Sequence, residues 1–249
     1  MDVSRYLECL AADRARLGAV AVTGLGEAVP GCPDWNVREL VRHLAEVYLH
    51  KVACMRDGVA PEVWPPDLTG EEPLALLDRA YAELVAEFTA RDPGSPAYTW
   101  YEPDQTVAFW IRRMALETVV HRVDAEQAVG ASSADIPDDL ADDGVDEVLG
   151  MMLPYVTRVW ADAFVGLLPD PGVRVLVDTG ERSWLVGLDP SGAMTGPGSA
   201  NQPVHATISG TPVDVLLWLW RRLPEEAVRR TGDRNAVDQL RRAIRVVTD

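Results

Sequence analysis

One segment limits the possible folds of this chain more than any other, because it places three ionisable side chains at helical spacing within apolar sequence. In residues 116–125, Glu117 and His121 are four positions apart and Asp124 follows three later. On a helix these residues share one face, and apolar neighbours such as Val120 would pack that helix into a core. Buried polar groups without partners are costly, and a divalent metal ion is one partner that would satisfy them.

A further ligand has to come from another helix. Asn36 followed by Glu39 has the form of a capping box and predicts a helix from residue 37 to about 56. His43 lies on this helix and is the natural third ligand. Together with predicted helices at residues 3–22, from 72 onward and at 107–129, this suggests a four-helix bundle, in which metal sites are built from facing helices.

The pattern changes in the second half of the chain. A helix is expected from Pro137 to about residue 167, kinked or split at Pro154. Beyond it we expect three strands, at residues 173–177, 184–188 and 205–209. A flexible loop is expected at residues 192–203, and two helices are expected at residues 211–220 and 235–247. We therefore predict a helical bundle with an extra helix over residues 1–168 and a small α+β domain over residues 169–249.

Two histidines and one glutamate form a donor set known for catalytic zinc, which leaves a coordination position open. The same donors also suit iron, nickel, manganese or cobalt. Simpler explanations exist for each residue. Glu117 could pair with Arg113, for about 0.3–0.5 kcal/mol if exposed, and Asp124 could pair with Arg122. We interpret His50 as a surface or groove residue. We interpret His205 as a structural residue.

Charge and cysteine content restrict the partners. The net charge is −16 and the pI is near 4.6, which argues against nucleic acid or an anionic membrane surface. The three cysteines have no metal-ligand spacing and are interpreted as reduced. The sequence shows no secretory signal and no apolar run long enough to cross a bilayer. We expect a cytoplasmic protein.

Three segments resemble the signatures of one family, the mycothiol-dependent maleylpyruvate isomerases. They are Trp35–Ala45, which contains His43, then Glu117–Glu126, and finally Val204–Gly210 together with Leu216–Pro224. The resemblance covers nearly the whole chain. It implies an α plus α+β fold, with an N-terminal DinB-like metal-binding four-helix bundle and a small C-terminal sterol-carrier-like α+β domain.

The resemblance also implies a ligand set and a co-substrate. A metal ion, usually zinc, would be held by His43, Glu117 and His121, and mycothiol would be the thiol co-substrate. Arg222 would help to bind the thiol or the substrate. The family pattern has glycine at the preceding position, where this chain has Arg221. The alternative for Arg222 is a cation near a helix C-terminus, which the helix dipole favours.

These expectations lead to one functional hypothesis and two alternatives. A thiol bound to zinc is deprotonated and is then a nucleophile for a small electrophile, either in cis-trans isomerisation of a maleylpyruvate-type substrate or in S-transfer. Asp124 would orient His121 or assist proton transfer. The alternatives are a non-catalytic metal- or thiol-binding regulatory member of the fold and a metal-dependent hydrolase that uses bound water. The chain would act as a monomer or homodimer.

Overall fold

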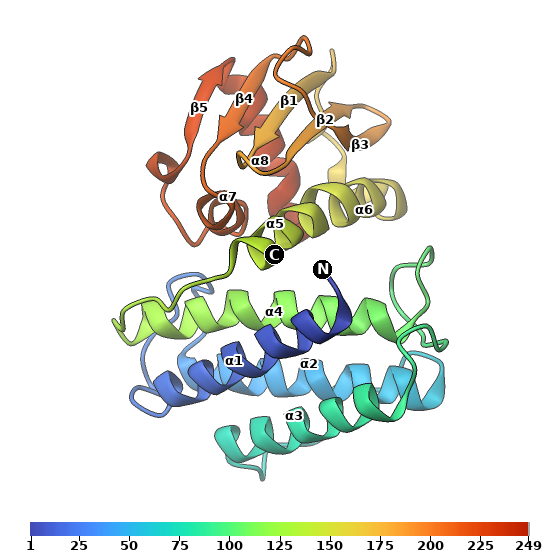
Figure 1. The fold of residues 1–249 in the computed structure, drawn as a ribbon, viewed down its shortest axis with the longest axis vertical. Helices are drawn as coiled ribbons and strands as arrows, with labels where there is room; N and C mark the ends of the chain where they lie inside the picture. Colours follow the sequence, from blue (N-terminus) through green and yellow to red (C-terminus); the bar gives the residue numbers. More distant parts are fainter. Residues whose placement is uncertain (249) are drawn as a thin grey trace. The chain divides into compact units, whose positions relative to one another are not determined.

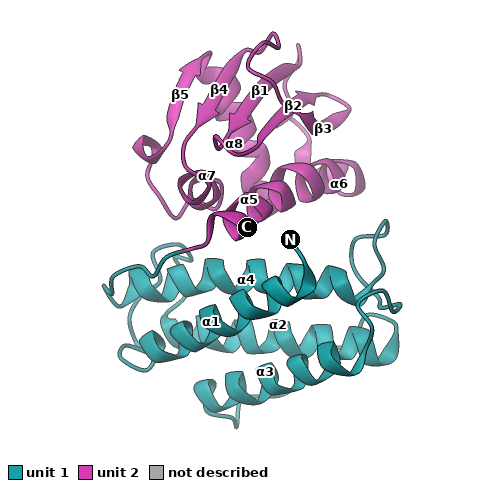
Figure 2. Cartoon of the chain, in the orientation of Figure 1, with its two compact units in different colours: residues 1–135 teal, residues 136–249 magenta. Residues whose placement is uncertain are grey.

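The computed structural model describes residues 1–248, and its helices and strands are shown in Figure 1. The chain divides into two compact units, residues 1–135 and 136–249 (Figure 2). The first is helical and the second contains a small mixed sheet with helices, which confirms the predicted fold class. Within residues 1–248, no helix combines the length and apolarity needed to span a membrane.

Four long helices form the first unit (Figure 1): α1 (Val3–Ala21), α2 (Val37–Asp57), α3 (Pro73–Ala90) and α4 (Val107–Ala128). α1 packs on α4, α2 packs on α3, and α2 also contacts α4. Most residues of α4 are buried. A helix buried on nearly all sides needs internal partners for any polar side chain it carries, so the polar groups of α4 have to be paired inside the bundle.

Capping fixes where α2 and α4 begin. The Asn36 side chain accepts a hydrogen bond from the Glu39 backbone, and the Glu39 side chain accepts one from the Asn36 backbone, which is the predicted capping box. Gly58 ends α2 in the left-handed conformation that glycine adopts at low cost. Thr106 caps α4. These caps set the registers of the two helices that carry His43 and His121.

The second unit is a five-stranded sheet with helices. The strand order is β3-β2-β1-β4-β5, with β1 and β4 parallel and the other pairs antiparallel. The strands are β1 (Val173–Asp178), β2 (Ser183–Asp189), β3 (Gly192–Pro197), β4 (Ala206–Ser209) and β5 (Arg229–Gly232). The helices are α5 (Asp138–Asp146), a π-helix (Glu147–Met152), α6 (Leu153–Val159), α7 (Pro212–Leu219), α8 (Arg234–Thr248), and 3₁₀ turns at Ala161–Phe164 and Glu225–Ala227.

Two strands were not predicted. Residues 192–197 were expected within a flexible loop, but they form β3 and pair with residues 184–189 of β2. Residues 229–232 form β5 beside β4. Both segments have little of the β-branched and aromatic content that marks strands. Their conformation comes from pairing with a neighbouring strand, which a local pattern does not reveal.

The helix expected from residue 137 to about 167 is shorter and interrupted. It ends at Val159, and the π-helix stands between α5 and α6. Pro154 lies in the first turn of α6, where its missing N–H is tolerated. Proline cannot donate to a carbonyl in the preceding turn, and the wider π-turn just before it accommodates that loss.

These interrupted helices lie in the second unit, whereas the sequence boundary at 168/169 assigned them to the bundle. α5 packs on α7, and α6 packs on β3. The Thr157 hydroxyl also accepts a hydrogen bond from the Ala193 backbone N–H at 3.0 Å. The contact-based boundary at 135/136 therefore falls before α5. An amphipathic helix reveals that it has a buried face, but not which partner covers that face.

Candidate metal centre

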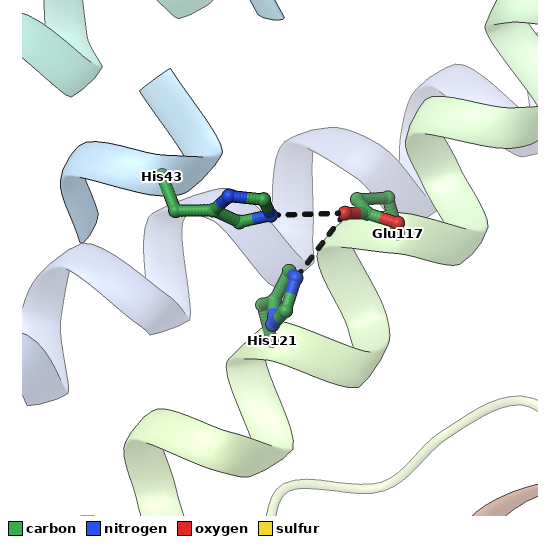
Figure 3. Close-up of side chains that lie close together, drawn as sticks. All are labelled: His43, Glu117 and His121. Carbon is green, nitrogen blue, oxygen red and sulfur yellow. Dashed lines mark hydrogen bonds and ion pairs between the residues drawn. The ribbon is translucent and has the colours of Figure 1, made fainter. Parts of the chain in front are cut away.

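Three side chains from α2 and α4 converge in the first unit (Figure 3). His43 extends from α2, and Glu117 and His121 extend from consecutive turns of α4. One potential ligand atom from each residue lies within 4.8 Å of the other two. Glu117 Oε1 is 3.6 Å from His43 Nε2 and 3.2 Å from His121 Nε2. The structure thus brings together all three residues that the sequence proposed as ligands.

The other nitrogen of His121 has its own partner. Nδ1 lies 3.0 Å from Asp124 Oδ2, and Asp124 is fully buried. Because an ionised carboxylate only accepts hydrogen bonds, this contact places a ring proton on Nδ1 and leaves Nε2 facing Glu117. A histidine ligand with its remote N–H on a carboxylate is a recurrent arrangement in metal sites.

The electrostatics of this cluster favour a cation. Burial by itself would lower the pKa of His121, but its hydrogen bonds to Asp124 and Glu117 and their charges raise the pKa to about 9. Burial opposes ionisation of Glu117, yet the charge of Arg113 and the bonds to His121 and His43 hold the pKa of Glu117 well below its ordinary value. The carboxylates thus stabilise positive charge on the imidazole, and a divalent cation would satisfy the same field.

Glu117 uses its two oxygens differently. Oε1 faces the two histidines, while Oε2 forms an ion pair with Arg113 one turn earlier on α4. The alternative interpretation of Glu117, a pair with Arg113, is therefore present together with the histidine cluster. Since both Arg113 and Glu117 have mostly buried side chains, this pair holds the carboxylate in one orientation.

The cluster opens on its His43 side. The His43 side chain is 34% exposed, compared with 14% for Glu117 and 10% for His121. The Trp35 ring lies 4.6 Å from the His43 ring, centroid to centroid, and 6.3 Å from that of His121. Trp35 was part of a signature segment, but the sequence assigned it no role. Trp35 immediately precedes Asn36, the N-cap of α2. This position was the sequence feature that could have indicated packing of Trp35 on α2.

The donor set fits a zinc-like ion. Zinc lies about 2.0–2.2 Å from nitrogen and oxygen donors in tetrahedral geometry, so that neighbouring donors are separated by about 3.3 Å. The 3.6 Å and 3.2 Å separations from Glu117 Oε1 are close to this value. Three protein donors with one partly exposed side leave a position for a fourth ligand, which is typical of catalytic rather than structural zinc sites.

Other ionisable residues have different surroundings. Arg122 pairs with Asp13 and Glu126, at 2.7 Å and 2.8 Å, instead of forming the proposed pair with Asp124. His50 Nδ1 lies near Lys51 Nζ and Cys54 Sγ on α2. In the second unit, His205 Nδ1 accepts a hydrogen bond from the Arg174 backbone, a structural position as expected.

Arg222 follows the C-terminus of α7 in the second unit. Its side chain is mostly buried, and its Nη1 donates to the Trp220 carbonyl at 2.6 Å. This is the location described by the helix C-terminus alternative. A role for Arg222 in binding thiol or substrate stays a prediction. The preceding Arg221 adopts φ +62°, a left-handed conformation that suits the glycine of the family pattern.

Fold and site together define a two-domain protein with a two-histidine, one-carboxylate cluster in its helical unit. Residues 7–126 match the mycothiol maleylpyruvate isomerase N-terminal domain, and residues 139–239 match the MDMPI C-terminal domain of the same family. The chain therefore belongs to the mycothiol maleylpyruvate isomerase family, which confirms the resemblance inferred from its sequence.

Solved structures give the same fold. The mycothiol-dependent maleylpyruvate isomerase superposes on this chain with a TM-score of 0.61 and 13% sequence identity, covering 94% of this chain and 95% of that one. A histidine-to-alanine mutant of a mycothiol-dependent maleylpyruvate isomerase gives a TM-score of 0.61 and 14% identity over the same fractions. Among curated proteins, no sequence matches this chain. At such low identity the structural likeness establishes the fold.

Proposed function

We propose that this chain is a metal-dependent and mycothiol-dependent enzyme that activates a thiol for addition to a small electrophile. The observation that carries the proposal is the His43, Glu117 and His121 cluster, supported by Asp124, in a member of this family. Relatives with the same fold are named mycothiol-dependent maleylpyruvate isomerases. Zinc is the proposed metal, because two histidines and one carboxylate form a common catalytic zinc set.

The residues of the cluster would divide the work among them. A bound zinc ion would supply one property, the deprotonation of a coordinated thiol at neutral pH. Asp124 would keep the proton on His121 Nδ1, so that Nε2 stays a donor atom. Arg113 would hold Glu117 Oε2 and leave Oε1 toward the histidines. Arg222 is proposed to bind a substrate carboxylate through its guanidinium.

The reaction then follows from thiolate chemistry. For a cis-enedioate conjugated to a ketone, the sulfur forms a bond to one alkene carbon and the electron pair moves onto the ketone oxygen. The former double bond is now single and can rotate. When the electron pair returns, the carbon–sulfur bond breaks, and the trans isomer and the thiolate are released. Protonation of the carbon instead of elimination would give a stable thiol conjugate.

Metal analysis of the purified protein tests the centre. We expect about one equivalent of zinc or a similar metal in the wild type and its loss in His43→Ala and His121→Ala. His50→Ala is the matched control, since His50 lies on the same helix and has different partners. If the wild type takes up no metal when zinc is added, the metal-dependent proposal is wrong.

An activity screen with and without thiol separates the remaining alternatives. Turnover of a maleylpyruvate-type substrate only when mycothiol is present supports the isomerase, and accumulation of a conjugate supports S-transfer. Turnover of an ester or amide without thiol would favour a metal-dependent hydrolase. Metal binding with no turnover of any of these compounds would favour the non-catalytic alternative.

A further inference from the structure

Lys51 is a basic residue of α2, the helix that carries His43, and like His43 it contacts a residue of α4. It lies eight residues after His43, about 12 Å further along the axis at 1.5 Å per residue. Helical side chains lean toward the N-terminus of their helix, which for Lys51 is the direction of His43. The charges of Lys51 and Glu117 are close enough to interact. The lysine therefore belongs to the surroundings of the histidine cluster.

The ammonium of Lys51 is held without a carboxylate partner. Nζ lies 3.3 Å from His50 Nδ1 and 4.7 Å from the centre of the Trp110 ring of α4. Within residues 1–248, no carboxylate forms an ion pair with it. An ammonium has three donors, and these two contacts leave donor capacity for an anion. Burial lowers the pKa of Lys51 to about 8, even though the charge of Glu117 acts in the opposite direction.

Arg113 is another cation near Lys51, but it cannot bind an anion in the same way because it is already paired with Glu117. Lys51 is also the only lysine among the chain's 23 lysine and arginine residues. A compact ammonium fits a space between an indole face and an imidazole, whereas a planar guanidinium is larger and has a fixed fork of donors. Within the described residues, Lys51 is thus a basic group between α2 and α4 with no carboxylate partner.

We propose that Lys51, seated on the Trp110 ring, binds one carboxylate of a dicarboxylate electrophile whose reacting end lies at the His43, Glu117 and His121 cluster. Lys51 is then a positioning residue that selects dianionic over monoanionic substrates. The proposal rests on the proposed function for the nature of the substrate. The anion would pair with a cation that is already desolvated, which strengthens their interaction.

A binding experiment tests this inference without requiring turnover. Maleate and its monomethyl ester are titrated by calorimetry into zinc-loaded wild type, Lys51→Met and Lys51→Arg. We expect wild type to bind maleate at least about tenfold more tightly than the monoester, and Lys51→Met to lose this preference. Lys51→Arg should restore part of it. The zinc content should be the same in all three proteins.

A purely structural role for Lys51 gives a different result. Methionine packs well on aromatic rings, so Lys51→Met would then keep the wild-type preference for maleate. That outcome would overturn the proposal, as would the lack of any preference in wild type. Because the measurement is equilibrium binding, an absence of thiol-dependent turnover would refute the proposed reaction and leave the carboxylate site to be judged by its own data.

Discussion

Asp124 Oδ2 and His121 Nδ1 lie 3.0 Å apart inside the bundle, and this contact orients the imidazole. Asp124 is fully buried and follows His121 by three residues on α4. A carboxylate at this position fixes the tautomer of the ring and increases its basicity as a ligand. The three-residue spacing of His121 and Asp124 is visible in the sequence. In the folded helix this spacing determines the direction in which His121 Nε2 points.

Asp124→Ala should weaken zinc binding about 10- to 100-fold, as is typical when the partner of a ligating histidine is removed. Asp124→Asn should lose less, because an amide oxygen still accepts from Nδ1. A competition titration with a chelator gives the affinities, and thermal unfolding checks that both variants are folded. Equal zinc affinity of Asp124→Ala and wild type would show that Asp124 does not support the site.

The second prediction concerns the ion cluster around Arg122. Arg122 is fully buried and pairs with Asp13 and Glu126. Arg122→Met leaves the buried carboxylate of Asp13 without its cation and that of Glu126 with Arg16 alone, which should lower the free energy of unfolding by about 3–5 kcal/mol. Arg56→Met is the control. Arg56 pairs with two glutamates on the surface, and its loss should cost at most about 1 kcal/mol.

Urea unfolding at pH 7 measures both variants. Similar losses for Arg122→Met and Arg56→Met would mean that the buried pairs contribute no more than exposed ones. The buried helix α4 thus carries an ion cluster around Arg122 and, separately, the proposed metal site around His121.

The sequence predicted the local features of the bundle well, because they depend on nearby residues. The pair Asn36 and Glu39 predicted the start of α2, and the four-residue spacing of Glu117 and His121 predicted that both lie on one helix face. His43 lies on a different helix from Glu117 and His121, so their contact is a tertiary relationship. It could be predicted only because a four-helix bundle was expected. The contact between Trp35 and His43 depends on the loop before α2, and no periodic pattern describes it.

The second unit was harder to predict for a different physical reason. Strand β3 (Gly192–Pro197) has only one β-branched residue, Thr195, and it is a strand because β2 offers it a row of backbone partners. Helix α6 has an apolar face, but only the folded chain shows that β3 covers it. Long-range pairing determined both the missed strands and the position of the boundary between the units.

The third prediction is a pH dependence that arises from His50. Burial, together with the nearby Lys51 charge, lowers the pKa of His50 to about 4, against about 6.5 in an unfolded chain. Between these values the unfolded state binds more protons than the folded state, so stability falls as pH decreases from 6.5 to 4. Because His50 is partly exposed, we expect a loss of about 1–2 kcal/mol, below the roughly 3 kcal/mol that the full shift would give.

Metal-free wild type and His50→Gln should be compared by urea unfolding at pH 7 and pH 4.5. The contributions of other groups are shared and cancel in the difference between the two proteins. His50→Gln should lose less stability on acidification than wild type does. If both proteins lose the same amount, the pKa of His50 is not lowered in the folded chain.

The fourth prediction concerns Arg221 at the end of α7. The Arg222 N–H bonds to the Leu217 carbonyl at 2.7 Å, and the Arg221 N–H bonds to the Trp218 carbonyl at 3.0 Å. These two bonds form a Schellman motif, which requires a left-handed residue at position 221. Arg221 meets this requirement with φ +62°, and its side chain donates to Thr248 Oγ1 at 2.6 Å.

Replacing Arg221 with alanine or glycine separates the backbone and side-chain contributions. Both variants lose the bond to Thr248, worth about 1 kcal/mol, but only glycine relieves the left-handed strain of about 1–2 kcal/mol. Arg221→Gly should therefore be about 1 kcal/mol more stable than Arg221→Ala. At the exposed helical position Arg242, glycine should instead be about 1 kcal/mol less stable than alanine. The same order at both positions, measured by denaturant unfolding, would contradict a strained Arg221. If glycine is the more stable residue at position 221 and alanine at position 242, then Arg221 occupies the same left-handed turn as the glycine of the family pattern. The two backbone bonds that position Arg222 are then the same with arginine or glycine at position 221.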